Sequence, residues 1–150
     1  MYLTIISSGE RNWNALVPEL NCIVTAPNRE ELLKLTRESI AVALEDVPAV
    51  SPTVNSVADI SPGVRAELDG SEEILFLNPA SMNPVSLEIE QTLNAAGVSQ
   101  AELARRIGSS RSAVNRLVNP FYWGHSLDVL RRVAEALNTE VQVKFAAKAS

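Results

Sequence analysis

The stretch from residue 99 to residue 117 constrains the fold most, because its pattern is that of two short helices joined by a tight turn. Ser99 is a good N-cap for the first helix, and Glu102, three residues later, predicts a capping box. Gly108 stands where this helix must end, because glycine tolerates the left-handed backbone conformation that a tight turn needs. These residues predict a helix, a turn and a second helix.

The second helix of this pair is free of acidic residues. Ser109 or Ser110 can cap it, and Val114 and Leu117, spaced three apart, supply its buried face. The residues left pointing outward can all donate hydrogen bonds: Ser110, Arg111, Ser112, Asn115 and Arg116. A helix-turn-helix of this kind lays its second helix in the major groove of DNA. The alternative is a structural helical hairpin with a solvated basic face.

The side chains of the second helix suggest a division of roles. Arginine can donate two hydrogen bonds to guanine, and asparagine can make two with adenine, so Arg111, Asn115 and Arg116 are the expected base contacts. Smaller polar groups suit the phosphates, which fix the register of a protein on DNA without reading sequence. The expected phosphate contacts are Gln100, Ser110 and Ser112.

Charge divides the chain into two unlike halves within an overall net charge of −5. Residues 1–85 hold five lysines and arginines against twelve acids, whereas residues 86–150 hold eight against six. The mildly basic half suits a polyanion, and the acidic half suits a basic partner surface. We therefore expect two domains, at residues 1–78 and 85–150, joined by a proline-containing linker at residues 79–84.

The first half predicts a small α+β domain. Residues rich in β-branched and aromatic side chains indicate strands, and Asn28 with Glu31 predicts a capping box at the start of a helix. The expected order β-β-β-α(-β) comprises strands at 2–7, 13–17 and 21–25, a helix at about 29–45 and a possible strand at 74–77. Three prolines in residues 47–70 predict a crossing loop with little regular structure.

The second half predicts a helical domain that ends in one strand. A helix from Val85 to Gly97 precedes the two motif helices, and a fourth helix follows Ser126. Residues 140–145 then alternate strictly between polar and apolar, which indicates a β-strand. A single strand needs an edge to pair with. We expect it to pair with its copy in a second chain, giving a homodimer or a higher even oligomer; the alternative partner is a strand of the same chain.

Both halves together resemble a HicB-family antitoxin of a bacterial type II toxin–antitoxin pair. The C-terminal resemblance, to a phage-repressor-like helix-turn-helix, rests on residues 101–108, 114–120 and 127–137; the N-terminal one rests on the order of elements and on residues 17–22 and 29–32. The resemblance implies a partial RNase H-like domain that has lost its catalysis and that blocks a small basic toxin, HicA, an mRNA-cleaving ribonuclease. It also implies that the C-terminal domain binds operator double-stranded DNA and represses the operon.

Nothing in the sequence predicts an enzyme, a metal site or a cofactor. The acids that could serve a two-metal nuclease lie outside the predicted strands and are expected to be solvated: Glu10, Glu19, Asp46, Asp59 and Asp69. His125 is the single histidine, expected on an exposed loop or near a phosphate, and the single cysteine, Cys22, lacks an obvious base partner. The aromatic run at 121–123 either packs the loop after the second motif helix, which we favour, or forms a ligand surface.

The sequence also predicts where the protein acts and leaves one alternative function open. No apolar run approaches the roughly 20 residues of a membrane span, and no signal peptide is visible, so a cytoplasmic protein without membrane contact is expected. The alternative to an antitoxin is a stand-alone phage-type transcriptional repressor whose N-terminal domain senses a small ligand.

Overall fold

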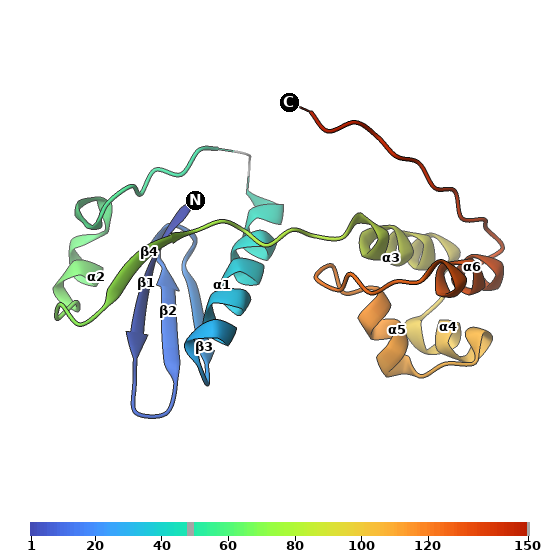
Figure 1. The fold of residues 1–150 in the computed structure, drawn as a ribbon, viewed down its shortest axis with the longest axis horizontal. Helices are drawn as coiled ribbons and strands as arrows, with labels where there is room; N and C mark the ends of the chain where they lie inside the picture. Colours follow the sequence, from blue (N-terminus) through green and yellow to red (C-terminus); the bar gives the residue numbers. More distant parts are fainter. Residues whose placement is uncertain (48–49, 150) are drawn as a thin grey trace. The chain divides into compact units, whose positions relative to one another are not determined.

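The computed structural model describes residues 1–47 and 50–149, which form two compact units at Met1–Ser81 and Met82–Ser150. The first unit combines strands with helices, and the second is built from helices (Figure 1). The chain is therefore of the α+β class, as predicted. Among the described residues, no helix is both long enough and apolar enough to cross a membrane.

The N-terminal unit is built on an antiparallel sheet. Its four strands lie in the order β3-β2-β1-β4, and every neighbouring pair is antiparallel. The strands are β1 (Tyr2–Ser8), β2 (Trp13–Val17), β3 (Cys22–Ala26) and β4 (Glu73–Leu77). The β1–β2 hairpin closes where the Gly9 N–H donates to the Asn12 carbonyl at 2.8 Å. The predicted strand order along the chain is confirmed, including the fourth strand that the sequence only suggested.

Helix α1 (Arg29–Ala43) covers one face of this sheet (Figure 1). Its N-cap is Asn28, as predicted, and the Asn28 side chain accepts from the Glu31 N–H at 2.8 Å. The reciprocal bond of the predicted capping box, from the Asn28 N–H to the Glu31 carboxylate, is not among the contacts of the described residues. Leu32 and Ile40 on α1 are completely buried, and they pack in clusters with strand residues such as Ile6. Burying a side chain of this size stabilises a fold by about 1.5–3 kcal/mol. The amphipathic helix thus supplies one half of the core of this unit.

The segment between α1 and β4 covers part of the opposite face, and it is more regular than predicted. Ile60 is buried against Leu3 and Ile5 of β1. The segment contains a 3-10 helix at Val57–Asp59, held by a Ser56–Asp59 capping box, and the short helix α2 (Pro62–Ala66). The expected loop is therefore interrupted by two short helical segments, because Pro62 occupies the first turn of a helix, where its missing N–H costs nothing. Residues 48–49 of the expected loop lie outside the described residues.

The C-terminal unit consists of four helices around one core. They are α3 (Pro84–Ala96), α4 (Gln100–Ile107), α5 (Arg111–Leu117) and α6 (Leu127–Ala136). Each begins with an N-cap side chain that accepts a backbone N–H: Asn83, Ser99, Ser110 and Ser126. The core is apolar and includes Leu103 and Val114, which are completely buried. Local caps and one shared core therefore define this unit.

The predicted terminal strand is not formed. Within the described part of the chain, residues 140–149 take no regular structure, and Val143 and Phe145 are 68% and 96% exposed. Alternation of polar and apolar residues is not sufficient for a strand, because the backbone groups also need a neighbouring edge with which to pair. The described strands pair with one another and not with this segment, and pairing with a second copy stays a prediction.

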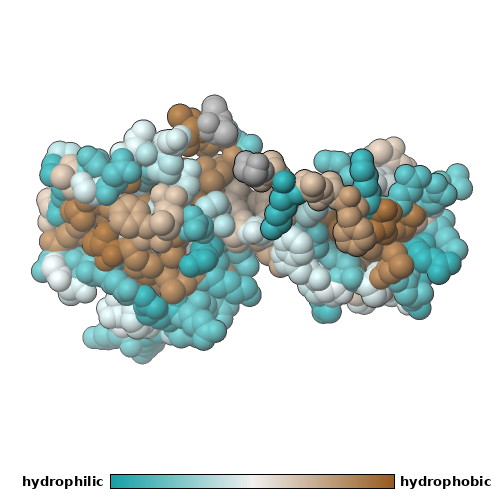
Figure 2. Space-filling view, turned by 45° about the horizontal axis from the view of Figure 1, so that its top comes forward, coloured by the Kyte–Doolittle hydropathy of each residue, from teal (hydrophilic) through white to brown (hydrophobic). Residues whose placement is uncertain are grey.

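Apolar side chains also reach the surface of both units, as the brown regions of Figure 2 show. On the sheet, Ile74 and Phe76 of the outer strand β4 are 38% and 42% exposed, and Ile23 of β3 is 78% exposed. In the C-terminal unit, Trp123 and Leu127 are more than half exposed. Single exposed apolar residues are ordinary, but the pair on β4 lies along a strand with a free edge.

Candidate nucleic-acid interface

The turn between α4 and α5 is set by backbone geometry at Gly108. This residue has φ 66° and ψ 37°, the left-handed conformation expected at the end of a helix. The Ser109 N–H donates to the Ala104 carbonyl at 2.9 Å, and the Gly108 N–H donates to the Arg105 carbonyl at 3.3 Å. Together these two bonds form a Schellman motif, which satisfies carbonyls that a helix end otherwise leaves unpaired.

Helix α5 begins at once after this turn, with Ser110 as its cap. The Ser110 hydroxyl oxygen accepts from the Ala113 N–H at 3.0 Å, so of the two serines proposed as the cap, Ser110 is the one used. The hydroxyl hydrogen of Ser110 takes no part in this contact, because the capping oxygen acts as an acceptor. A capping serine at this place can therefore still donate to a phosphate.

The two faces of α5 differ as the sequence predicts. Val114 and Leu117 are buried against α4, α3 and α6, which fixes the side of α5 that turns outward. The residues expected on that outer side are all exposed: Ser110, Arg111, Ser112, Asn115 and Arg116. Gln100 is half-buried at the first position of α4. Their contacts with DNA remain predictions.

The outer face of α5 is available for a ligand. In the described chain, the side chains of Arg111, Ser112 and Asn115 take part in none of the hydrogen bonds or ion pairs, and α5 holds no acid in its first turn. The guanidinium of Arg116 lies 5.9 Å from the centre of the Tyr122 ring, within range of a cation–π contact. The arrangement presents two arginines and an amide on one short helix, without carboxylates to neutralise them.

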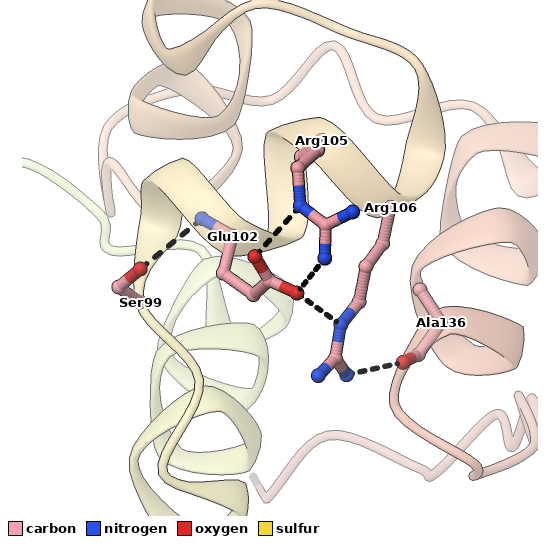
Figure 3. Close-up of polar contacts among 5 residues, drawn as sticks. All are labelled: Ser99, Glu102, Arg105, Arg106 and Ala136. Atoms are coloured by element: carbon pink, nitrogen blue, oxygen red, sulfur yellow. Dashed lines mark hydrogen bonds and ion pairs between the residues drawn. The ribbon is translucent and has the colours of Figure 1, made fainter.

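Helix α4 carries a cluster of charged side chains, which Figure 3 shows. The Glu102 carboxylate accepts from Arg105 at 2.9 and 2.5 Å and from Arg106 at 3.0 Å. The hydrogen bonds from Arg105, and then those from Arg106, hold the pKa of Glu102 at about 2, well below its usual value. Arg106 also donates to the Ala136 carbonyl at 3.0 Å, so this cluster ties α4 to the end of α6.

This cluster corrects one detail of the predicted capping box. Ser99 does accept from the Glu102 N–H, at 3.1 Å. The reciprocal bond from the Ser99 N–H to the Glu102 carboxylate is absent from the contacts described, because both carboxylate oxygens are taken by arginines. Half of the motif is formed, and the other half is replaced by a bridge between helices.

The loop that follows α5 contains a residue whose place the sequence did not reveal. The His125 ring is half-buried, and its Nε2 lies 2.7 Å from the Leu117 carbonyl at the end of α5. It contacts the C-terminal end of α5, whereas the sequence suggested an exposed loop or a phosphate contact. Of the neighbouring aromatics, Tyr122 packs against the core and Trp123 is 61% exposed. A single histidine between Gly124 and Ser126 gave no signal of this position.

Three of the five acids considered for a nuclease site accept structural hydrogen bonds instead. Burial raises the pKa of Glu19, but hydrogen bonds from the N–H and hydroxyl of Thr53 and the N–H of Val54 outweigh it and lower the pKa. Asp59 and Asp69 accept from nearby backbone N–H groups, chiefly at Asn55 and Ser71. Among the described residues, no group of three or more potential ligands gathers around a metal position.

Comparison with known protein families identifies the helices around this face. Residues 88–142 match the Cro/C1-type HTH DNA-binding domain, a stretch that includes α4, α5 and α6. No curated protein matches the chain. The helix-turn-helix is therefore similar to the DNA-binding domains of transcriptional regulators, a class that is not typically enzymatic.

Proposed function

We propose that this chain is a HicB-type antitoxin that represses its own operon through α5 and neutralises a small, mRNA-cleaving, HicA-type toxin through its N-terminal half. In this proposal residues 1–78 bind the toxin, residues 79–84 are the linker, and residues 85–150 bind DNA and join copies of the chain. The observation that carries the DNA-binding role is the exposed, acid-free outer face of α5 within a Cro/C1-type helix-turn-helix.

The proposed operator contacts follow from the chemistry of that face. Arg111, Asn115 and Arg116 read bases, because each can make paired hydrogen bonds in the major groove. Three further residues, Gln100, Ser110 and Ser112, contact phosphates at the N-terminal ends of α4 and α5, where unpaired backbone N–H groups also attract anions.

The proposed toxin contact rests on charge and on the order of elements. The N-terminal unit holds twelve acids and five basic residues, and the acids at both ends of α1 are exposed: Glu30, Glu31, Glu45 and Asp46. A surface of this sign attracts a basic partner and speeds their encounter. A four-stranded antiparallel sheet with one helix on its face also suits a partial RNase H-like domain, which would be a binding scaffold here.

The proposed oligomer uses the C-terminal segment. Residues 140–145 keep their polar and apolar alternation, and Val143 and Phe145 are exposed in the isolated chain. Pairing of this segment with its copy would bury these side chains and supply the missing edge. A two-fold dimer would present two copies of α5 to a palindromic site, with half-sites about 34 Å apart.

The DNA-binding half is tested on a duplex from the region directly upstream of the chain's own coding sequence. Replacing Arg111 or Asn115 by alanine should weaken operator binding by about 1–3 kcal/mol and relax one base preference. Arg131→Ala removes the same charge from an exposed position on α6 and is the matched control. Unchanged affinity after both α5 substitutions would show that α5 is not the reading helix.

The toxin-binding half is tested with the neighbouring reading frame. If it encodes a small basic protein, the two chains should co-purify in fixed proportion, and the complex should lack the ribonuclease activity of the small protein alone. A chain cut after Met82 should still bind the toxin but not DNA. Purification from the host that yields operator DNA and no protein partner would favour the ligand-sensing repressor.

A further inference from the structure

The loop between α5 and α6 holds Tyr122 by its backbone and by its side chain. The Tyr122 N–H donates to the Asn119 carbonyl at 3.1 Å, and the Tyr122 hydroxyl donates to the Gly124 carbonyl at 3.0 Å. The Tyr122 carbonyl accepts from the side-chain nitrogen of Asn83 at 2.9 Å, and the ring is tilted against that of His125 at 5.0 Å between centroids. Tyr122 also packs against the apolar core of the unit. These contacts fix the position of the ring beside α5.

The glycine at position 124 leaves the space in which this ring lies. A Cβ built on Gly124 would lie 2.5 Å from the Tyr122 hydroxyl oxygen, 2.7 Å from Cζ and 2.9 Å from Cε2 of the same ring. Real Cβ atoms essentially never come within 3.0 Å of another heavy atom, so a larger residue here would displace the ring. The φ of Gly124 lies outside the left-handed region. The ring, and not the backbone conformation, is therefore what requires glycine at this position.

The fixed ring lies beneath Arg116 of α5. The Arg116 guanidinium carbon is 5.9 Å from the centre of the Tyr122 ring, within the range of a cation–π contact. None of the ion pairs among the described residues involves Arg116, so no carboxylate there competes with the ring for this side chain. A guanidinium that stacks on an aromatic face keeps its N–H groups free, because they lie in its own plane. The contact is therefore compatible with donation to a base.

We propose that Tyr122 is a positioning residue for Arg116, whose guanidinium it holds ready to read a base of the operator. This inference rests on the proposed function, in which Arg116 is a base contact. A free arginine side chain samples many rotamers and loses that freedom when it binds, whereas a side chain already held loses less. Gly124 contributes by leaving room for the ring. Operator specificity then depends on two loop residues that lie outside the reading helix.

The experiment is a double-mutant cycle on operator binding by the full-length chain. Tyr122→Leu removes the ring but keeps an apolar side chain against the core. It should weaken operator binding by about twofold to fivefold, the range of a cation–π contact at an exposed site. The loss should fall on the base pair whose replacement no longer matters in Arg116→Ala, and the preference at the base pair read by Arg111 should not change. In the Arg116→Ala background, Tyr122→Leu should cause no further loss, because the interaction is already absent.

Two further variants separate the ring from the rest of the loop. Tyr122→Phe keeps the ring and loses only the hydroxyl bond to Gly124, so it should retain most of the operator affinity. Gly124→Ala changes no side chain of α5 or of the core but displaces the ring, so its loss of affinity should match that of Tyr122→Leu. Added to Tyr122→Leu, the same Gly124→Ala change should have no effect, because leucine lacks the ring atoms that the new Cβ would meet.

A proton NMR spectrum of the free chain tests the contact without DNA. The ring current of Tyr122 should move the δ-methylene protons of Arg116 upfield of their position in Tyr122→Leu and in Gly124→Ala. The same chemical shifts in the wild type and in both variants would refute the contact, whatever the chain binds.

Each binding outcome has a distinct meaning. An equal loss from Tyr122→Leu with and without Arg116 would show that the loop supports the unit as a whole, and it would overturn the positioning role. Unchanged affinity of Tyr122→Leu would overturn it as well, and a rise would indicate that the ring holds Arg116 away from DNA. A wild-type chain that does not prefer its operator to an unrelated duplex would overturn the proposed function, and the role of Tyr122 in base reading with it, even where NMR shows the contact.

Discussion

Replacing Gly108 by alanine tests the claim that the turn of the helix-turn-helix depends on backbone conformation and not on space. A Cβ built at this position meets no heavy atom within 4 Å, so no clash contributes to the cost. The left-handed conformation costs an L-residue about 1–2 kcal/mol. The smaller conformational freedom of alanine in the unfolded chain returns about 0.4–1 kcal/mol. The net loss should therefore be about 1 kcal/mol, or roughly 4–8 °C in the melting temperature of a domain of this size.

Calorimetry of the full chain should show this loss in the transition of the C-terminal unit. Gly108→Asn should recover much of it, because asparagine tolerates the conformation, and Asn21 and Asn138 adopt it in this chain. Gly63→Ala is the matched control: its Cβ also meets open space, but its φ is not left-handed, so we expect a gain of up to about 1 kcal/mol in the N-terminal unit. A Gly108→Ala loss above about 3 kcal/mol, or none at all, would refute the reasoning.

Two further substitutions test the charged cluster on α4 and the core under α1. The pKa of Glu102 is lowered to about 2 in the folded chain, so its stabilising contribution is complete above about pH 4.5 and is lost as the pH falls toward 2. The melting temperature of Glu102→Gln should thus approach that of the wild type between pH 5 and pH 2.5; a constant gap would contradict the role of ionised Glu102. Leu32→Ala, at a completely buried position, should cost about 2–5 kcal/mol in urea unfolding, and a loss below 1 kcal/mol would show that the sheet does not depend on α1.

The features that the sequence predicted well are those that depend on a few adjacent residues. The caps at Asn28, Ser99 and Ser126 form because each side chain reaches a backbone N–H only three residues away. The left-handed turn at Gly108 and the two-sided character of α5 follow from the same short range. The residues on the outer face of α5 could therefore be predicted from the sequence alone.

The features that the sequence did not predict depend on distant partners. The spacing of Ser99 and Glu102 predicts a full capping box, but arginines at the end of α4 bind the Glu102 carboxylate instead. One of them, Arg106, also reaches α6. His125 finds its partners 8 and 39–42 positions away, at distances that no spacing rule covers. The terminal segment 140–149 has the pattern of a strand but takes no regular structure and pairs with none of the described strands. Local pattern shows what a segment is able to form, whereas the partner decides whether it forms.

The free edge of β4 has a consequence for how the N-terminal unit behaves in solution. An outer strand can act as a template for another extended chain, and natural sheets commonly guard such edges with lysine, proline or bulges. Here Glu73–Leu77 contains no lysine or proline, and its one charge, on Glu73, is tied to Arg29 at 2.6 Å. We expect the shared negative charge of the units that carry them to keep two such edges apart. Salt shortens the reach of that repulsion from about 10 Å at 0.1 M to about 3 Å at 1 M. Raising the ionic strength should therefore favour association of this protein through the edge of β4.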